Sequence, residues 1–183
     1  VRNKGGLGSK SALLEVKHAD ISFGGIHAVK DLSFIVHAGE IVGLIGPNGS
    51  GKSTCVNLIS GTYQLDAGEI WLDGKLIPKK MKAADRVPLG IGRTFQTPKP
   101  FGNMTVYDNI LTCALRTRSF KEAHEKTREI LALSGLDEYE EMISEKLPIE
   151  KRKLLDMARI LTNNPKLIMM DEVMAGLNPI EME

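Results

Sequence analysis

A glycine-rich segment constrains this chain more than any other feature. Residues 46–53 read Gly-Pro-Asn-Gly-Ser-Gly-Lys-Ser, which satisfies the pattern GxxxxGK[ST]. The residues before it, 41–45, are apolar on both faces, as in a buried parallel strand, and residues 53–60 read as a helix. A strand, a glycine-rich loop and a helix in this order predict a phosphate-binding α/β fold.

Each residue type in this loop has a chemical reason. Glycines at 46, 49 and 51 permit backbone angles that other residues avoid, and they allow close approach to a phosphate. Successive N–H groups at a helix N-terminus then face the negative charge. Lys52 is expected to reach the β- and γ-phosphates, and the Ser53 hydroxyl to bind Mg²⁺. The predicted phosphate-binding residues are Gly46, Asn48, Gly49, Ser50, Gly51, Lys52, Ser53 and Thr54.

Two further segments carry polar side chains suited to the same site. Residues 166–170 form a second apolar strand that ends in Asp171 and Glu172. Asp171 is placed to hold Mg²⁺ and Glu172 to activate water, although an acidic pair in a solvated loop is the plain alternative. Gln96, between the two motifs, is a candidate ligand for Mg²⁺ and water, although a lone glutamine is usually a surface residue.

Length and composition limit the possible classes of protein. The 183 residues suit one domain, and the net charge of +1 gives no electrostatic case for a nucleic-acid partner. No apolar run reaches the roughly 18 residues of a membrane span. Cys55 and Cys113 form no CxxC pair, so small buried hydrophobes are expected rather than a metal site. Residues 1–10 are predicted to be a loose tail.

The order of elements predicts a composite domain over residues 11–183. Strands are expected at 12–23 and 31–36, a hairpin at 69–77, and helices at 104–115, 121–133 and 150–161. We therefore predict an α/β P-loop NTPase with a mostly parallel core sheet, an N-terminal antiparallel β subdomain and a helical subdomain inserted at about 98–162.

These motifs together resemble the ATP-binding subunits of ABC transporters, and among them the branched-chain amino-acid uptake type. The resemblance runs from about Leu13 to the end of the chain. The supporting segments are residues 23–25 (Phe-Gly-Gly), 42–53, 93–98 (Arg-Thr-Phe-Gln-Thr-Pro), 104–106 (Met-Thr-Val) and 175–179 (Ala-Gly-Leu-Asn-Pro).

The resemblance implies specific roles. Phe23 would stack on adenine, Gln96 would be the Q-loop residue, Asp171 the Walker B acid and Glu172 the catalytic base. Residues 175–178 would be the D-loop, which contacts a second ATPase subunit. The implied cofactors are ATP and Mg²⁺. The implied partners are that second subunit, two membrane permeases and an external solute-binding protein, with this chain on the cytoplasmic face of the membrane.

The chain also departs from the family pattern. The signature, normally Leu-Ser-Gly-Gly-Gln, should fall at residues 147–151, which read Leu-Pro-Ile-Glu-Lys. Pro148 has no N–H to donate, and Glu150 would bring negative charge toward phosphate, although an acid also favours a helix N-terminus. Val173 replaces a common proline. The four histidines all precede Asp171, so none fits the family's switch position, and the C-terminal part of the domain is expected to be missing.

The leading prediction is an ATPase subunit that powers uptake of branched-chain amino acids or similar small solutes. One alternative is a nucleotide-binding module without useful hydrolysis, which the altered signature favours. Another is a non-transport ABC ATPase that acts on nucleic acid, although the zinc cysteines, tandem domains and long coiled coils of such proteins are not found in this sequence.

Overall fold

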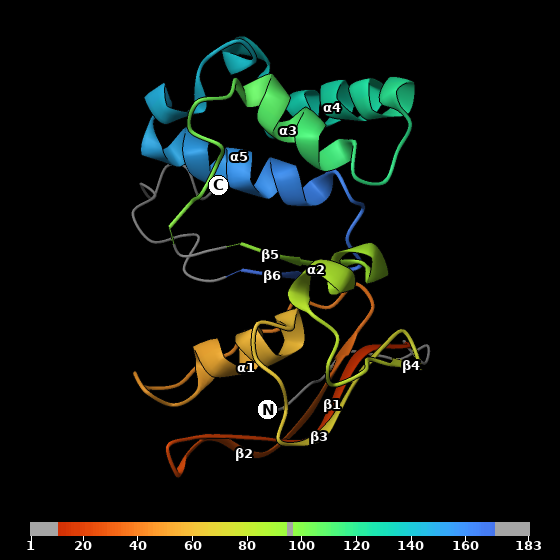
Figure 1. Ribbon diagram of the computed structural model, residues 1–183, viewed down its shortest axis with the longest axis vertical. Helices are drawn as coiled ribbons and strands as arrows, with labels where there is room; N and C mark the ends of the chain where they lie inside the picture. The colour runs from red at the N-terminus through yellow and green to blue at the C-terminus, as the bar shows by residue number, and fades with distance from the viewer. Residues whose placement is uncertain (1–10, 95–96, 171–183) are drawn as a thin grey trace. The chain divides into compact units, whose positions relative to one another are not determined.

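Figure 1 shows the computed structural model, which describes residues 11–94 and 97–170. The chain forms two compact units, Val1–Arg86 and Val87–Glu183.

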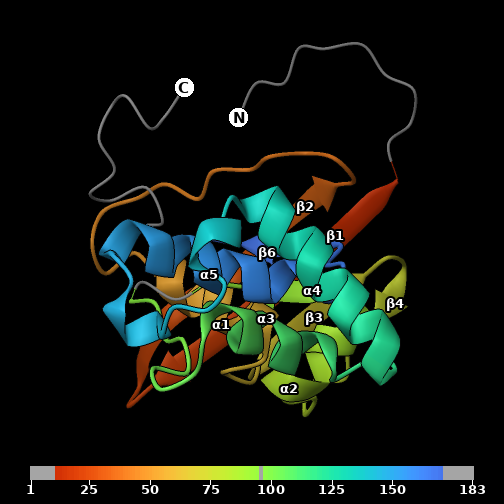
Figure 2. The same ribbon diagram turned by 90° about the horizontal axis from the view of Figure 1, so that it is seen from above.

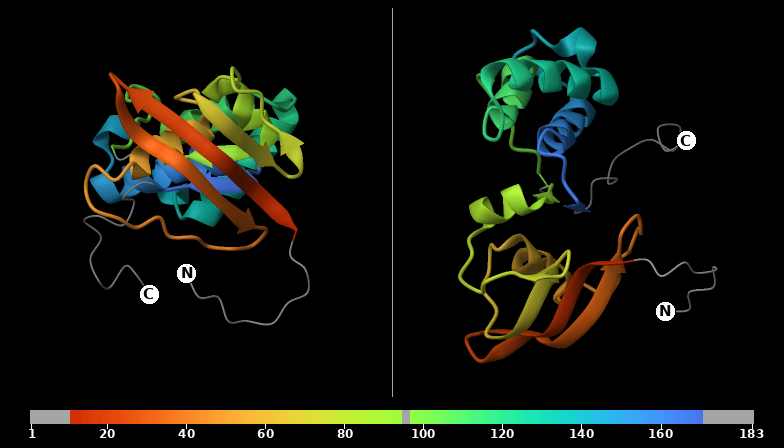
Figure 3. Two further views of the ribbon diagram at one scale, coloured as in Figure 1. Left: turned by 90° about the horizontal axis from the view of Figure 1, so that it is seen from below. Right: turned by 90° about the vertical axis from the view of Figure 1, so that its right-hand side faces the viewer.

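The first unit is built on an antiparallel sheet with the strand order β2-β1-β3-β4. Its strands are β1 (Ala12–Phe23), β2 (Ile26–His37), β3 (Ala67–Leu72) and β4 (Lys75–Leu76). The long strands β1 and β2 run side by side (Figures 2 and 3), because only two residues connect them. Alternate apolar residues of the sheet are buried, as the period of a strand requires: Leu14, Val16, Ala19, Ile21, Val29, Val36, Ile70 and Leu72.

The predicted strands of this sheet are confirmed, and β2 is longer than expected. The predicted hairpin turns at Asp73 and Gly74, whose φ angles are both positive, at 50° and 71°. Positive φ at both central residues is the geometry of a tight two-residue turn between antiparallel strands, and Asp-Gly adopts it readily.

The strand expected at residues 41–45 is not formed. Ile41 and Ile45 are 99% and 93% exposed, and no strand is assigned between His37 and Lys52. An apolar strand of this type is stable only with neighbouring strands that satisfy its N–H and C=O groups. The described strands of the first unit pair among themselves, so residues 41–45 have no ladder partner there.

Two helices complete the first unit. Helix α1 (Lys52–Ser60) confirms the predicted helix after the glycine-rich loop, and it buries Cys55, Leu58 and Ile59. Helix α2 (Ala83–Arg86) is a single turn that ends in a buried arginine.

The second unit contains two short parallel strands, β5 (Ile91–Arg93) and β6 (Leu167–Met169). The strand predicted at 166–170 is therefore confirmed as β6, but its residues are only partly buried. The 3₁₀ turn η1 (Val87–Leu89) precedes β5. The Thr94 N–H extends the pairing by donating to the Met169 carbonyl at 3.0 Å.

Three helices form the remainder of the second unit: α3 (Val106–Ala114), α4 (Phe120–Ser134) and α5 (Ile149–Leu161). The 3₁₀ turns η2 (Asp137–Tyr139) and η3 (Ser144–Lys146) connect α4 to α5. These helices surround one apolar core (Figure 2), formed by Val106, Ile110, Ile130, Leu131, Leu136, Leu147, Leu155 and Ala158. All three predicted helices are present, and the helical subdomain at 98–162 stays a prediction.

Local capping explains where two of these helices begin. The Thr105 side chain accepts a hydrogen bond from the Asp108 N–H at the start of α3. Ser119 and Glu122 form a reciprocal capping box at the start of α4. Among the described residues, no helix combines the length and apolarity needed to cross a membrane.

Candidate functional site

The glycine-rich loop forms a compact turn before α1. The Ser50 N–H donates to the Pro47 carbonyl at 3.2 Å, and Gly49 and Gly51 have φ angles of +80° and +85°. Both glycines therefore use the left-handed conformation that the sequence predicts. Gly46 does not: its φ lies outside that region, and a Cβ there would meet closely only Ser50 Oγ, at 2.7 Å, a side-chain atom that can rotate away.

Gly51 is the most tightly constrained residue of the loop. A Cβ on Gly51 would lie 2.3 Å from the carbonyl oxygen of Ala28 in β2. Real Cβ atoms are essentially never found so close to another heavy atom, so only glycine lets the loop approach β2 in this way. The sheet thus holds the start of α1 in place through this contact.

The Lys52 ammonium group lies against the backbone of the same loop. Its Nζ donates to the carbonyl oxygens of Gly46 and Pro47, each at 2.7 Å. An ammonium group carries three donors, so the loop itself uses two of them. This places the positive charge over the loop turn.

The N-terminus of α1 is suited to bind an anion. Its N-cap residue is Gly51, the helix has no side-chain cap, and its first turn contains no acidic residue. The N–H groups at this end therefore donate to no capping side chain. The helix dipole adds a partial positive charge at the same place. Ser53 is exposed in this first turn, and Thr54 is partly buried beside it. A hydroxyl oxygen at this position fits a hard cation such as Mg²⁺.

Arg86 supports the opposite end of α1, and sequence reasoning did not identify it. It is only 2% exposed, and its guanidinium donates to the carbonyls of Leu58 and Ile59, each at 2.8 Å, and of Met81 at 3.2 Å. Desolvation by burial lowers the pKa of Arg86 from its ordinary value. Two of these bonds reach carbonyls in the last turn of α1, where the helix itself supplies few donors, although the Leu58 carbonyl also accepts from the Gly61 N–H at 3.2 Å. A lone arginine at the end of a single helical turn carries no local sequence signal for this role.

Phe23 lies in the same unit as the loop, at the end of β1. The residue is 46% exposed, and its ring packs edge-to-face against Tyr63, with 5.2 Å between ring centroids and an angle of 66° between planes. An exposed aromatic face is what stacking on a base requires. Sequence reasoning did not identify Tyr63, because no local pattern links it to Phe23.

The other predicted site residues lie outside the described part of the chain. Gln96, Asp171 and Glu172 are among them, as is the segment 175–178. The structure therefore brings together the loop residues 46–54 on one unit, and the roles of both groups of residues stay predictions.

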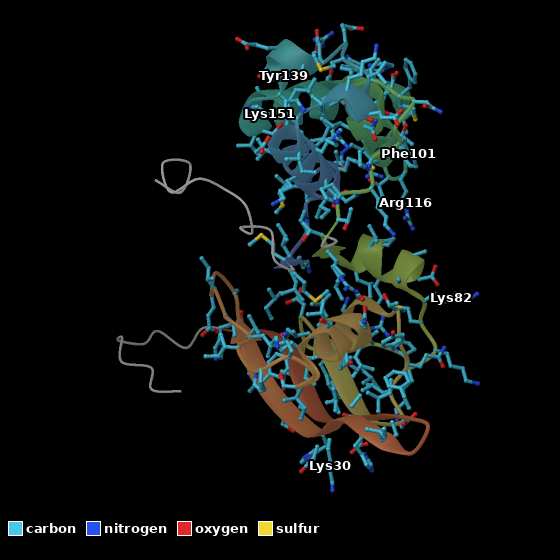
Figure 4. All side chains as sticks on the ribbon, turned by 90° about the vertical axis from the view of Figure 1, so that its left-hand side faces the viewer. Lys30, Lys82, Phe101, Arg116, Tyr139 and Lys151 are labelled. Carbon is cyan, nitrogen blue, oxygen red and sulfur yellow. The ribbon has the colours of Figure 1, made fainter. Side chains whose placement is uncertain are left out.

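The structure also describes the start of α5, where the sequence places the altered signature. Pro148 is the N-cap, without a side-chain cap, and Glu150 lies in the first turn. Two nearby cations are engaged locally: Arg152 Nε donates to the Leu147 carbonyl at 2.8 Å, and Lys151 Nζ lies 5.4 Å from the centre of the Tyr139 ring (Figure 4). This helix start therefore carries an acid and no N–H at its cap residue, which is poorly suited to bind a phosphate.

Comparison with known proteins identifies the family. The family model described as "ABC transporter" matches residues 29–175, which is most of the chain. The chain therefore belongs to the ABC transporter family, as an ATP-binding subunit of the ATPase class. This confirms the fold class and the ATPase activity class that the sequence predicts.

Two curated relatives and one solved structure are similar to most of this chain. A probable branched-chain amino acid transport ATP-binding protein, LivG of Archaeoglobus fulgidus, is 35% identical over 92% of this chain and 70% of its own length. The lipopolysaccharide export system ATP-binding protein LptB of Escherichia coli is 33% identical over 93% of this chain and 71% of its own. A solved ATP-binding cassette of an ABC transporter has a TM-score of 0.82 and 33% identity, covering 92% of this chain and 72% of the other.

Proposed function

We propose that this chain is the ATP-binding subunit of an ABC importer, which hydrolyses ATP to drive uptake of branched-chain amino acids or similar small solutes. The observation that carries this proposal is the phosphate loop: Gly49 and Gly51 in left-handed conformations, Lys52 folded over the turn, and an uncapped helix N-terminus behind them. The import assignment is supported by the similarity to LivG.

Within the proposed site, the chain's own residues mainly position and neutralise phosphate. The N–H groups of the loop and of the first turn of α1 donate to the phosphate oxygens, and Lys52 neutralises the charge that develops on the γ-phosphate. Phe23 stacks on the adenine ring. Glu172 accepts a proton from the attacking water, and Gln96 orients that water.

Magnesium fits the donor set, because Ser53 offers an exposed hydroxyl oxygen at the start of α1. Asp171 and Gln96 would complete the oxygen ligands. When bound, Mg²⁺ would supply positive charge that offsets the negative charge of the phosphates.

The proposed partners are a second ATPase subunit, transmembrane permeases and, indirectly, an external solute-binding protein. This arrangement would place the chain on the cytoplasmic face of the cell membrane. The net charge of +1 gives no support to a nucleic-acid partner.

Complementation tests the direction and substrate of transport. The chain is supplied to cells that lack their own LivG-type subunit, and uptake of radiolabelled leucine is measured, with Lys52→Ala as the matched control. We expect uptake to be restored by the unaltered chain and not by the variant. Restored lipopolysaccharide export in cells depleted of LptB, without leucine uptake, would contradict the import assignment.

The start of α5 favours one second candidate, a nucleotide-binding module without useful hydrolysis. With Pro148 as N-cap and Glu150 in the first turn, α5 is poorly suited to face a phosphate of a neighbouring subunit. This candidate predicts Mg-ATP binding without phosphate release. Measuring phosphate release after adding an ABC ATPase subunit with an intact signature separates the two candidates.

A further inference from the structure

Phe23 and Tyr63 form an exposed aromatic pair in the first unit. Tyr63 is 38% exposed and Phe23 46%, and their rings meet edge-to-face at 5.2 Å. In this geometry Tyr63 covers at most one face of the Phe23 ring. A π face of Phe23 is therefore left for another planar group, in an orientation that Tyr63 sets.

The segment that carries Tyr63 is fixed at both ends. On one side, the Tyr63 N–H donates to the carbonyl of Asn57 in α1, at 3.1 Å. On the other, the Asp66 N–H donates to the Asp20 carbonyl at 2.9 Å, and the Ser22 N–H donates to Asp66 Oδ2 at 2.8 Å. Tyr63 is thus tied both to the helix that follows the phosphate loop and to the end of β1 that carries Phe23.

The same scaffold relates the aromatic pair to the phosphate loop. Gly51 lies directly against the Ala28 carbonyl in β2. Ala28 is two residues, roughly 7 Å, along the strand from Ile26, and Ile26 pairs with Phe23 across the hairpin. Phe23 therefore lies within reach of a base whose phosphates occupy the loop.

We propose that Tyr63 is a positioning residue for nucleotide binding, which holds the Phe23 ring edge-on so that it presents one face to the adenine of ATP. The inference rests on the proposed function, in which Phe23 stacks on adenine. Tyr63 does not touch the nucleotide. It acts by removing the rotational freedom that an exposed phenylalanine would otherwise lose on binding.

Calorimetric titration of the full chain with two ligands tests this role. Mg-ATP reports on base and phosphates together, whereas Mg-tripolyphosphate reports on the phosphate loop alone. An edge-to-face pair contributes enough to predict that Tyr63→Ala raises the Kd for Mg-ATP about threefold to tenfold. The Kd for Mg-tripolyphosphate should not change, and Tyr63→Phe, which keeps the ring, should bind ATP like the unaltered chain.

The double variant provides the decisive comparison. If Tyr63 acts through Phe23, then Phe23→Ala with Tyr63→Ala binds ATP no more weakly than Phe23→Ala alone. Three results would overturn the role of Tyr63 while leaving the proposed adenine platform intact. The first is additive losses in the double variant, and the second is equal weakening of Mg-ATP and Mg-tripolyphosphate binding by Tyr63→Ala. The third is a Tyr63→Ala chain that keeps its ATP affinity although Phe23→Ala loses affinity. No loss in Phe23→Ala would overturn the proposed adenine platform and the role of Tyr63 with it.

Discussion

Three alanine substitutions in the phosphate loop should destabilise the chain in a fixed order, because each glycine is constrained differently. Gly46 has no left-handed φ, and its added Cβ would meet only a serine hydroxyl, which can rotate away. Gly49 has a φ of +80° but nothing within 4 Å of its Cβ position. Gly51 combines a φ of +85° with a backbone oxygen at 2.3 Å.

The magnitudes follow from these constraints. Gly46→Ala should change the free energy of unfolding by less than about 0.5 kcal/mol, as for substitutions away from special features. Gly49→Ala places alanine in a left-handed conformation, which costs about 1–2 kcal/mol. Gly51→Ala adds a close contact with rigid backbone, and overpacking of this kind costs about 1–3 kcal/mol more. We therefore expect a total loss of about 2–5 kcal/mol for Gly51→Ala.

Urea unfolding of the three variants, followed by circular dichroism, measures these differences. Gly49→Ala is the matched control, because it shares the backbone strain of Gly51→Ala without the contact. Equal losses for the two variants would refute the contact between the loop and β2. A loss for Gly46→Ala as large as that for Gly49→Ala would refute the backbone assignment of the loop.

Three further predictions concern residues around this site and in the helical unit. Arg86→Met should lower the free energy of unfolding by about 2–4 kcal/mol, because the carbonyls of Leu58, Ile59 and Met81 lose the Arg86 donors. Lys82→Met, at an exposed residue, should change it by less than about 0.5 kcal/mol, and urea titration measures both. Hydrogen bonds from the Ser119 side chain and backbone lower the pKa of Glu122 from its ordinary value of 4.5, so its stabilising contribution is present above that value and is lost as the pH falls through the lowered pKa. The difference in urea midpoint between the unaltered chain and Glu122→Ala, seen at pH 7, should therefore shrink as the pH falls through the lowered pKa, and a difference that did not change with falling pH would contradict this assignment. Burial raises the pKa of the Cys55 thiol to about 11, so iodoacetamide at pH 8 should alkylate Cys113 before Cys55 in the native chain. In urea the two cysteines should react equally, and peptide mass spectrometry measures both rates.

The phosphate loop and the three long helices could be predicted because their signals are local. Glycine spacing and a helical apolar period act over a few residues. The Asp73-Gly74 turn is of the same kind. For these elements the sequence pattern and the structure agree closely.

The features that sequence reasoning missed depend on contacts between distant residues. Residues 41–45 have the composition of a buried strand, but a strand also needs neighbours, which the described part of the first unit does not supply. Arg86 reaches the carbonyls of Leu58 and Ile59 across 28 and 27 residues, and Tyr63 packs on Phe23, 40 residues earlier in the chain. No pattern within a short window shows which side chains the fold will bring to the ends of α1.

Calorimetric titration with Mg-ATP tests the central claim most directly, with Lys52→Ala as the control. Lys52 holds the positive charge over the loop turn, and a charge-assisted bond to phosphate contributes about 1.5–3 kcal/mol. We predict that the unaltered chain binds Mg-ATP and that Lys52→Ala binds at least about tenfold more weakly. Equal binding by the two chains, or no binding by the unaltered chain, would contradict the assignment of residues 46–53 as the nucleotide site.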